Sequence, residues 1–291
     1  MTQKHEQRFA EYREVIEKEL AQALHPADGL DVMQAMRYST LGGGKRIRGV
    51  LALEFCRIYS AKSAPGGDVR KAVCVAAAIE MIQAFSLVHD DLPCMDDDDV
   101  RRGKPSCHKQ FSEATALLAG DALLANSFNT VAAAMFLPKS ERLKPEQVVP
   151  IISTLSNATM EMIKGQQLDM SYEKSGKITH DELIGMYNRK TCALISAACV
   201  CGAITADAPD RDLHMARGYG VALGLAFQIT DDLIDFETEK SGKKTIPVLS
   251  GSEKAVELSR EYTDMAVKIA EKLPNGEFLK ELALSLISRE S

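Results

Sequence analysis

The chain has 291 residues, of which 45% are hydrophobic and 26% charged, so it can bury a substantial core. A net charge of −6 and a pI of about 5.6 argue against nucleic acid as a general partner. Residues 1–15 contain no apolar signal core, no apolar run reaches membrane-spanning length, and the seven cysteines include no CxxC pair. These features predict a cytoplasmic protein with free thiols and no stable membrane insertion.

Helical periodicity dominates the chain, and alternating strand patterns are missing. The first helix places Phe9, Tyr12, Ile16 and Leu20 at spacings of three and four residues. Further helices are predicted over residues 29–40, 45–60, 69–91, 111–136, 146–171, 180–205, 212–236, 252–272 and 276–289. Gly- and Pro-rich segments separate these helices, without a fixed repeat or a long linker. We therefore predict a single all-α domain over residues 1–291, a bundle of about ten helices.

Two of the predicted helices contain stretches that are apolar almost all round, at residues 71–89 and 218–229. Such helices belong inside a large bundle rather than on its surface. Polar residues within them are therefore informative, because a buried charge must be paired or must bind a cation.

The second of these helices ends in "FQITDDLIDFE", which contains Asp231, Asp232 and Asp235. With the preceding glutamine, Gln228, at the origin and about 100° per residue, the three aspartates lie at roughly −60°, 40° and −20°. All four polar groups therefore share one face. Three carboxylates on one stripe are unfavourable unless a cation faces them, although a solvated helix end is the alternative interpretation.

The first apolar helix runs into "HDDLPCMDDDDVRRG", where six aspartates fall within residues 90–99. Two like charges 4 Å apart repel by about 4 kcal/mol at an effective dielectric near 20, so compensation is needed. Gln83, Ser86 and Asp90 share one helix face. Pro93 disfavours helical geometry at the preceding residue, so the chain is expected to kink or loosen there. A solvated acidic turn is the alternative.

Two acidic clusters on buried helices, far apart in sequence, favour a common site. If the two helices face each other across a bundle, their carboxylates bracket a cavity, as in bundle-core metal sites. Oxygen-only ligands suit Mg²⁺ or Mn²⁺ rather than zinc. Because Mg²⁺ favours carboxylates together with substrate phosphates, a phosphorylated substrate is implied.

Basic residues occur in several places that could complement a polyphosphate. The segment "GGGKRIRG" puts a flexible turn ahead of Lys45, Arg46 and Arg48, but it lacks P-loop spacing and no strand precedes it. Further polar or basic candidates follow at Arg101, Arg102, Lys190, Thr191, Lys243 and Lys244. Each alone fits an ordinary solvated charge, and only their combination indicates a diphosphate site.

Six motifs, "GGGKRIRG", "SLVHDDLPCMDDDDVRRGKPSCH", "AGDALL", "GQQLDM", "RKT" and "FQITDDLID", occur in the order found in trans-isoprenyl diphosphate synthases. Over most of its length the chain resembles the bacterial farnesyl/geranylgeranyl diphosphate synthases. The resemblance implies an isoprenoid-synthase bundle around a deep central cavity, in which the two aspartate motifs face each other. It also implies a homodimer.

The resemblance assigns a role to each matching position. Three Mg²⁺ ions, with Mn²⁺ as a substitute, would be held by Asp90, Asp91, Asp96, Asp231 and Asp235. Catalytic residues would be these five together with Lys190 and Asp232. Residues expected to bind the allylic diphosphate are Arg101, Lys190, Thr191, Gln228 and Lys243. Residues expected to bind isopentenyl diphosphate are Gly44, Lys45, Arg48, Arg102 and Gln83, the last where many bacterial members carry His.

The implied reaction condenses isopentenyl diphosphate with an allylic diphosphate, dimethylallyl or geranyl, by ionisation, condensation and elimination. Chain length would be set by Phe85 and Ser86, one helical turn before Asp90. In similar enzymes an aromatic residue five positions before the first aspartate limits growth, so Phe85 favours the C15 product, farnesyl diphosphate. Geranylgeranyl (C20) and geranyl (C10) diphosphate are the alternative products.

Three other interpretations compete with a condensing enzyme. A terpene cyclase also ionises diphosphates, but it does not need Lys45, Arg48 and Arg102. A non-catalytic subunit of a heteromeric synthase typically loses aspartates from one motif, whereas both are intact here. A divalent-cation scaffold leaves the basic residues unexplained. One departure from the family is a short loop after "DDLID", which leaves open whether Lys243 or Lys244 contacts diphosphate.

Overall fold

A computed structural model describes residues 1–25, 29–61, 66–174, 177–238 and 244–287. The helices are α1 (Gln3–Ala23), α2 (Asp31–Leu41), α3 (Ile47–Ser60), α4 (Val73–Asp90), α5 (Cys107–Gln110), α6 (Glu113–Ala133), α7 (Pro145–Lys174), α8 (His180–Tyr187), α9 (Ala193–Thr205), α10 (Asp210–Thr238), α11 (Ile246–Ser250), α12 (Ser252–Ala270) and α13 (Glu277–Ile287). Shorter elements are the 3₁₀ turns η1 (Arg70–Ala72) and η2 (Ala134–Phe136), the π-helical segment η3 (Asn188–Cys192), and strands β1 (Val100–Arg101) and β2 (Lys104–Pro105). The predicted all-α class is confirmed.

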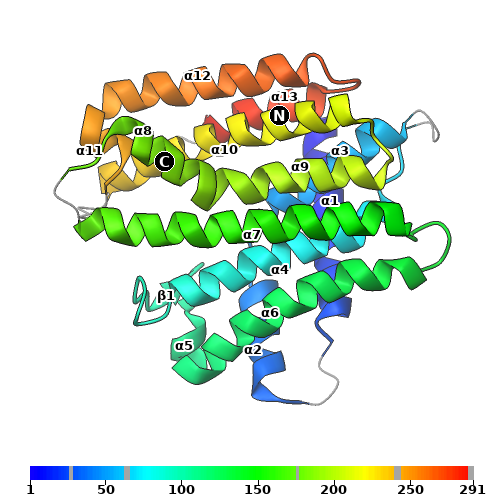
Figure 1. The fold of residues 1–291 in the computed structure, drawn as a ribbon, viewed down its shortest axis with the longest axis horizontal. Coiled ribbons are helices and arrows are strands. Elements are labelled where there is room, and N and C mark those ends of the chain that lie inside the picture. Colours follow the sequence, from blue (N-terminus) through cyan, green and yellow to red (C-terminus); the bar gives the residue numbers. More distant parts are fainter. Residues whose placement is uncertain (26–28, 62–65, 175–176, 239–243, 288–291) are drawn as a thin grey trace.

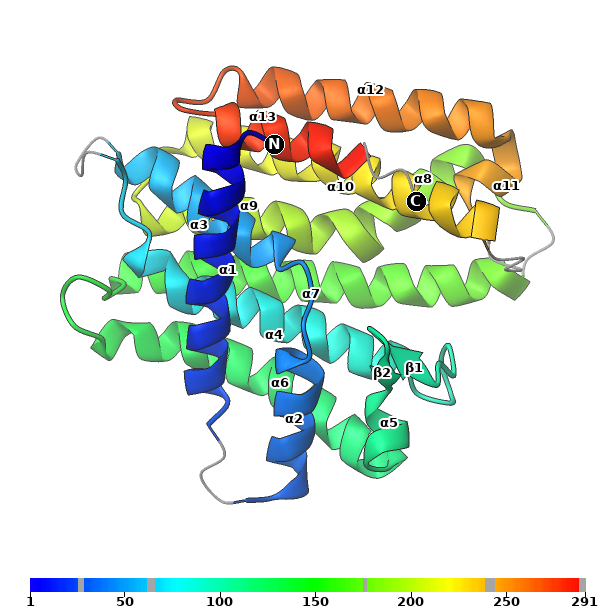
Figure 2. The same cartoon turned by 180° about the vertical axis from the view of Figure 1, so that it is seen from behind.

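The helices form layers around α4 and α9 (Figures 1 and 2). Helix α6 packs on α4, α7 packs on α9, and α12 packs on α10. Seen from behind, α1 crosses the ends of several other helices (Figure 2). It packs against α3 and α4. The central helices are consequently covered on several sides, which was predicted for α4 from its apolar sequence.

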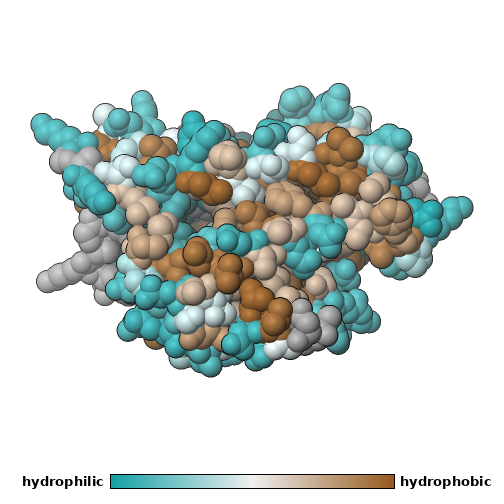
Figure 3. All heavy atoms as spheres, turned by 60° about the horizontal axis from the view of Figure 1, so that its bottom comes forward, coloured by the Kyte–Doolittle hydropathy of each residue, from teal (hydrophilic) through white to brown (hydrophobic). Residues whose placement is uncertain are grey.

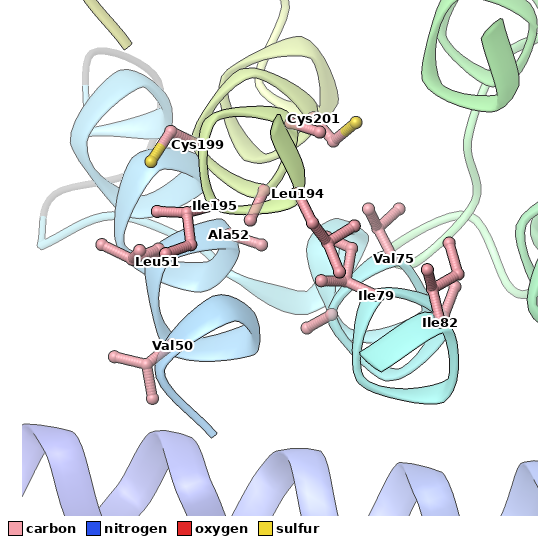
Figure 4. Packing of buried hydrophobic residues seen from close by; sticks show 14 of the residues in the cluster. Val50, Leu51, Ala52, Val75, Ile79, Ile82, Leu194, Ile195, Cys199 and Cys201 are labelled. Atoms are coloured by element: carbon pink, nitrogen blue, oxygen red, sulfur yellow. The ribbon is translucent and has the colours of Figure 1, made fainter. Parts of the chain in front are cut away.

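Helices α3, α4 and α9 supply the centre of the core. Every residue of α9 from Leu194 to Thr205 is buried. Figure 4 shows Ile79 of α4 beside Leu194 of α9. A Cβ atom on Gly202 would lie 2.1 Å from the carbonyl oxygen of Ala52, so a larger residue would force α9 away from α3.

The segment Arg70–Asp90 is the one helix among the described residues that is long and apolar enough to cross a membrane. This corrects the expectation that no run reaches that length. However, 72% of its most apolar window is buried inside the protein. The apolar character of α4 is therefore that of a core helix, since its side chains face other helices instead of lipid.

Two local features differ from uninterrupted helices. Helix α4 ends at Asp90, in agreement with the break predicted from Pro93. The predicted helix over 180–205 instead consists of α8 and α9 with the π-helical segment η3 between them. A Cβ atom on Gly165 of α7 would lie 2.3 Å from the backbone nitrogen of Lys190, so glycine is required where α7 meets this segment.

Candidate active site

The first aspartate motif begins at the end of α4. The turn after Asp90 brings Asp96 back beside it, because the Asp96 backbone N–H donates to the Asp90 carbonyl at 2.9 Å. Burial raises the pKa of Asp90 to about 6, and the neighbouring Asp96 and Asp91 carboxylates add to this rise, whereas Lys190 and Arg101 oppose it. A carboxylate with a raised pKa is one that a further cation would stabilise.

Asp91 is directed to a different partner from Asp90. Its carboxylate accepts a hydrogen bond from Nε of Arg101 at 2.9 Å, and its side chain is almost completely buried. Nη2 of the same guanidinium donates to Asp98 at 2.8 Å. Arg101, at the end of β1, thus compensates two of the crowded carboxylates. The structure brings Asp91 and Arg101 together as an ion pair.

The second motif lies on α10, where the three aspartates differ in environment. Asp232 is buried, Asp231 is half-buried and Asp235 is exposed. Asp232 accepts hydrogen bonds from the Tyr187 hydroxyl and, at 2.9 Å, from Nε2 of Gln228. Burial raises the pKa of Asp232 to about 6, and its two hydrogen bonds only partly oppose that rise. The Asp232 carboxylate is thus oriented by two side chains, whereas Asp231 and Asp235 are the more exposed carboxylates of this helix.

The π-helical segment η3 lies between the two motifs. Lys190 forms an ion pair with Asp169 of α7 and lowers the pKa of Asp90, so it is within electrostatic range of the first motif. The next residue, Thr191, donates its hydroxyl proton to Oε1 of Gln228 at 2.5 Å, which connects it to the second motif. One short segment thus links both acidic clusters, which places these predicted diphosphate ligands together.

Arg48 lies in the first turn of α3, far from both aspartate motifs in the sequence. Its Nε atom is buried and has no hydrogen-bond partner within the described residues. Burial lowers the pKa of the Arg48 guanidinium, while Glu80 and Asp231 act in the opposite direction. The influence of Asp231 places Arg48 within electrostatic range of the second motif. Arg48 as a whole is half-buried, and a buried guanidinium nitrogen that lacks an acceptor among the described residues is suited to an anionic ligand.

Arg46 has a structural role instead. Its guanidinium donates to Glu17 at 2.7 Å and to Glu80 at 3.5 Å. Glu80 in turn accepts from the backbone N–H of Gly49 at 2.9 Å. This buried network fixes the start of α3, because each charged group in it has a partner.

The glycine-rich turn before α3 contacts the second arginine of the RRG motif. The Arg102 guanidinium donates to the carbonyl of Gly43. A Cβ atom on Gly44 would lie 3.0 Å from Cζ of Arg102, and Gly44 has a φ of +128°, so glycine is required for both reasons. Lys45 is exposed and Gln83, on α4, is half-buried. The predicted isopentenyl residues Gly44 and Arg102 are therefore neighbours.

The remaining predicted residues lie as follows. Lys243 is outside the described residues, and Lys244 is half-buried just before α11. Phe85 is buried and its ring packs edge-on against His89, with the ring centroids 5.1 Å apart. Ser86 is half-buried, and its hydroxyl donates to the carbonyl of Gln83 at 3.0 Å.

Sequence reasoning gave no role to three residues that the structure brings into this region. Asp169 pairs with Lys190, and Tyr187 donates to Asp232. Both polar atoms of the Gln166 side-chain amide are buried, and neither has a partner within the described part of the chain. Gln166 and Asp169 belong to the "GQQLDM" motif, which was the only available signal.

The donor set of the two motifs fits a hard divalent ion, because it consists of carboxylate oxygens. Among the described residues, the one group of three potential ligands whose donor atoms all lie within 4.8 Å of one another is Asp97, Asp99 and His108. Asp90 and Asp231 are not in it. The two motifs therefore do not form a preassembled cage, as expected where substrate phosphates complete the coordination.

Comparisons with known proteins agree with this geometry. The model of the polyprenyl synthetase family matches residues 31–257. Farnesyl diphosphate synthase of Bacillus subtilis is 39% identical over 249 residues, covering 84% of this chain and 80% of that protein. Geranylgeranyl pyrophosphate synthase 12 of Arabidopsis thaliana is 39% identical over 250 residues, covering 80% and 67%. A farnesyl/geranylfarnesyl diphosphate synthase structure from Zymomonas mobilis superimposes with a TM-score of 0.88 at 32% identity, covering 99% and 100%.

Fold and site together define an enzyme of the isoprenoid synthase class, a trans-prenyltransferase. The match to the family model extends over most of the chain, and the chain belongs to the polyprenyl synthetase family.

Proposed function

We propose that this prenyltransferase condenses isopentenyl diphosphate with dimethylallyl or geranyl diphosphate, and that its main product is farnesyl diphosphate. One observation carries most weight. Lys190 is within electrostatic range of Asp90, and Thr191 is hydrogen-bonded to Gln228 beside the second motif. Arg48 and Arg102 supply further positive charge from α3 and from the RRG motif. Two separate groups of diphosphate ligands fit a reaction between two diphosphates.

Asp90, Asp91 and Asp96 from the first motif, with Asp231 and Asp235 from the second, would hold three Mg²⁺ ions, with Mn²⁺ as a substitute. The ions would supply charge neutralisation of the departing pyrophosphate. The Asp91 carboxylate already accepts a hydrogen bond from the Arg101 guanidinium. To bind an ion, Asp91 must therefore share this hydrogen bond with the ion or release it.

Ionisation of the allylic substrate breaks a C–O bond and leaves negative charge on the diphosphate. Lys190, Thr191, Gln228 and Arg101 would bind that group, with Lys243 or Lys244 from the following loop. Donors that are fixed before the reaction stabilise the developing charge without reorganising. Lys190 is held by Asp169 and Thr191 by Gln228, so both are oriented before substrate arrives.

The second substrate, isopentenyl diphosphate, would bind at Arg48, Arg102, Gly44, Lys45 and Gln83. The double bond of this substrate attacks the allylic cation, forming a C–C bond, and a proton then leaves the new cation for the departing pyrophosphate. The buried Nε of Arg48 would gain its missing acceptor from the diphosphate. Enclosure by helices excludes water, which would otherwise quench the cation.

Incubating the purified protein with Mg²⁺, isopentenyl diphosphate and dimethylallyl diphosphate tests the proposal. We expect Mg²⁺-dependent release of pyrophosphate and a C15 product. A cyclic hydrocarbon would instead support a terpene cyclase, and inactivity would support a non-catalytic subunit or a cation scaffold.

Product length is the finer part of the proposal, since geranylgeranyl synthases are represented among the relatives as well as farnesyl synthases. Phe85 is buried one helical turn before Asp90, where it would limit growth of the product. We expect Phe85→Ala to shift the product from C15 to C20 or longer, measured by chromatography. Leu284→Ala, at an exposed position of α13, is the control and should keep C15. Unchanged products in Phe85→Ala would contradict the assignment.

A homodimer in the cytoplasm completes the proposal. Large apolar side chains are exposed on two adjacent helices, Leu117 and Leu118 on α6 and Val149, Met160 and Ile163 on α7. Figure 3, which turns the lower side of Figure 1 towards the viewer, shows apolar patches on the surface seen from there. Exposed apolar patches commonly mark interfaces. Light scattering should give twice the chain mass, and a monomeric mass would contradict this assembly.

A further inference from the structure

The four consecutive aspartates from Asp96 to Asp99 lie in different environments. Asp96 folds back beside Asp90, and Asp98 pairs with Arg101 at 2.8 Å. Asp97 and Asp99 are exposed and belong to a different group. A carboxylate oxygen of each lies within 4.8 Å of the other and of a ring nitrogen of His108.

His108 is the observation that points to a ligand at this place. The residue is only 7% exposed. One ring nitrogen, Nδ1, lies 3.1 Å from the hydroxyl oxygen of Ser106. The other, Nε2, is buried and has no hydrogen-bond partner in the part of the chain that the structure describes. An unpartnered buried nitrogen is unfavourable in a folded protein and calls for a missing partner.

Local backbone structure holds these residues in place. Strands β1 and β2 pair antiparallel, and beyond them the Ser106 N–H donates to the Asp99 carbonyl at 2.9 Å. This closes the hairpin, so that Asp99 and the start of α5 are neighbours. Asp97 has a φ of +52°, a left-handed conformation that turns the chain between Asp96 and Asp98.

We propose that Asp97, Asp99 and His108 bind a borderline divalent transition-metal ion of the Zn²⁺ type. Two carboxylates and one imidazole are a mixed oxygen and nitrogen set, which suits Zn²⁺ better than the oxygen-preferring Mg²⁺ of the prenyl-transfer site. With its proton on Nδ1, directed to Ser106, the imidazole presents the Nε2 lone pair, as metal-binding histidines do. Water would complete the coordination on the exposed side.

Lys109 currently provides the positive charge next to Asp99. Its Nζ lies 2.7 Å from Asp99 Oδ1, and both side chains are largely exposed. A bound ion would replace this lysine. It would then neutralise Asp97 and Asp99 together and tie the loop after Asp96 to the start of α5. This structural role does not depend on the proposed reaction.

Zinc binding by equilibrium dialysis tests the site. The background protein carries Asp90→Asn and Asp231→Asn, which remove catalytic cation ligands, and Cys94→Ser, which removes the one exposed cysteine. We expect it to bind one equivalent of Zn²⁺. Adding His108→Gln should weaken binding at least about tenfold. His214→Gln, which changes an exposed histidine of α10, is the matched control and should bind as the background does.

Two further variants test the zinc site even if His108→Gln fails to fold. Ser106→Ala should weaken Zn²⁺ binding by about 10- to 100-fold, because the imidazole loses its orienting partner. Lys109→Ala should strengthen binding, because an exposed competitor is removed. Cobalt bound in place of zinc should give a visible absorption band that His108→Gln abolishes. Absence of the zinc equivalent from the background protein, or its persistence in His108→Gln, would overturn the proposal.

Discussion

The two aspartate motifs have similar sequences but different structures. The first begins where α4 ends and continues through a turn and a hairpin, so its carboxylates point to several partners. Arg101 compensates Asp91 and Asp98, and Lys109 compensates Asp99. The second stays on a regular helix, α10, where Asp232 is buried and held by Tyr187 and Gln228.

The comparison shows that the place of an aspartate, rather than its membership in a motif, decides what it does. Because the chain leaves the helix after Asp90, the carboxylates separate, and Asp91, Asp98 and Asp99 form ion pairs that reduce their repulsion. The second motif remains helical, so Asp231 and Asp235 lie one turn apart on one face, while Asp232 is buried. Substitutions at these residues test this distinction.

The largest effect is expected from Asp90→Asn and from Asp231→Asn, one residue from each motif. An amide of the same shape cannot neutralise a divalent ion, so we expect kcat to fall by about 10³-fold or more in each variant. Steady-state kinetics of pyrophosphate release would measure this. Asp121→Asn, at an exposed position of α6, is the control and should remain close to the unaltered enzyme. If kcat fell in only one of the two variants, the substituted aspartate of the other motif would have no direct role in the reaction.

A smaller loss, of about 10²-fold in kcat/KM, is expected for Lys190→Ala, because the segment that links both motifs loses its charge. The adjacent Arg189→Ala is the control, since Arg189 pairs with Glu161 away from Asp90. It should change kcat/KM by less than about threefold. If both substitutions had equal effects, Lys190 would not be a specific diphosphate ligand.

The pH dependence should distinguish the buried carboxylates from the solvated ones. Because burial raises the pKa of Asp90 and of Asp232 to about 6, their protonated forms favour folding. Their contribution to the free energy of unfolding therefore falls as pH rises from about 4 to 6, and stays low above that. Binding of a divalent ion needs the ionised form of Asp90, so the stabilisation of the fold by a bound ion should increase as pH rises.

Melting temperatures with and without Mg²⁺ would test this. We expect a rise on adding Mg²⁺ at neutral pH that disappears near pH 5, where Asp90 is protonated. In Asp90→Asn the Mg²⁺-induced rise should be smaller at neutral pH. A rise of equal size at both pH values would contradict a metal site on this carboxylate.

The smallest effect on rate is expected for Tyr187→Phe, which removes one of the two donors to Asp232. Gln228 still donates at 2.9 Å, so we expect kcat to fall by less than about tenfold. The backbone N–H of Ile246, which donates to the Tyr187 hydroxyl at 3.3 Å, would lose its acceptor. Urea unfolding should therefore show a loss of about 1–3 kcal/mol. A loss of rate as large as that of Asp231→Asn would instead place Asp232 among the metal ligands.

The class of fold and both acidic motifs could be predicted from the amino-acid pattern alone. Apolar residues at helical spacing identify α1, and the apolar stretches in α4 and α10 predict buried helices, because burial of apolar surface requires that pattern. Pro93 predicted the end of α4, since the residue before proline avoids helical geometry. The two short strands escaped prediction because two residues are too few to show alternation.

Only the tertiary structure decided which side chains meet. Lys190 pairs with Asp169 across 21 residues, and Tyr187 reaches Asp232 across 45. Burial that leaves Nε of Arg48 and Nε2 of His108 without partners among the residues that the structure describes also depends on other elements packing over them. Helical spacing fixes only which residues share a face, within three or four positions of one another. Which face meets which is set by packing between distant helices, and that contact decides whether a carboxylate is paired, held or ready for a cation.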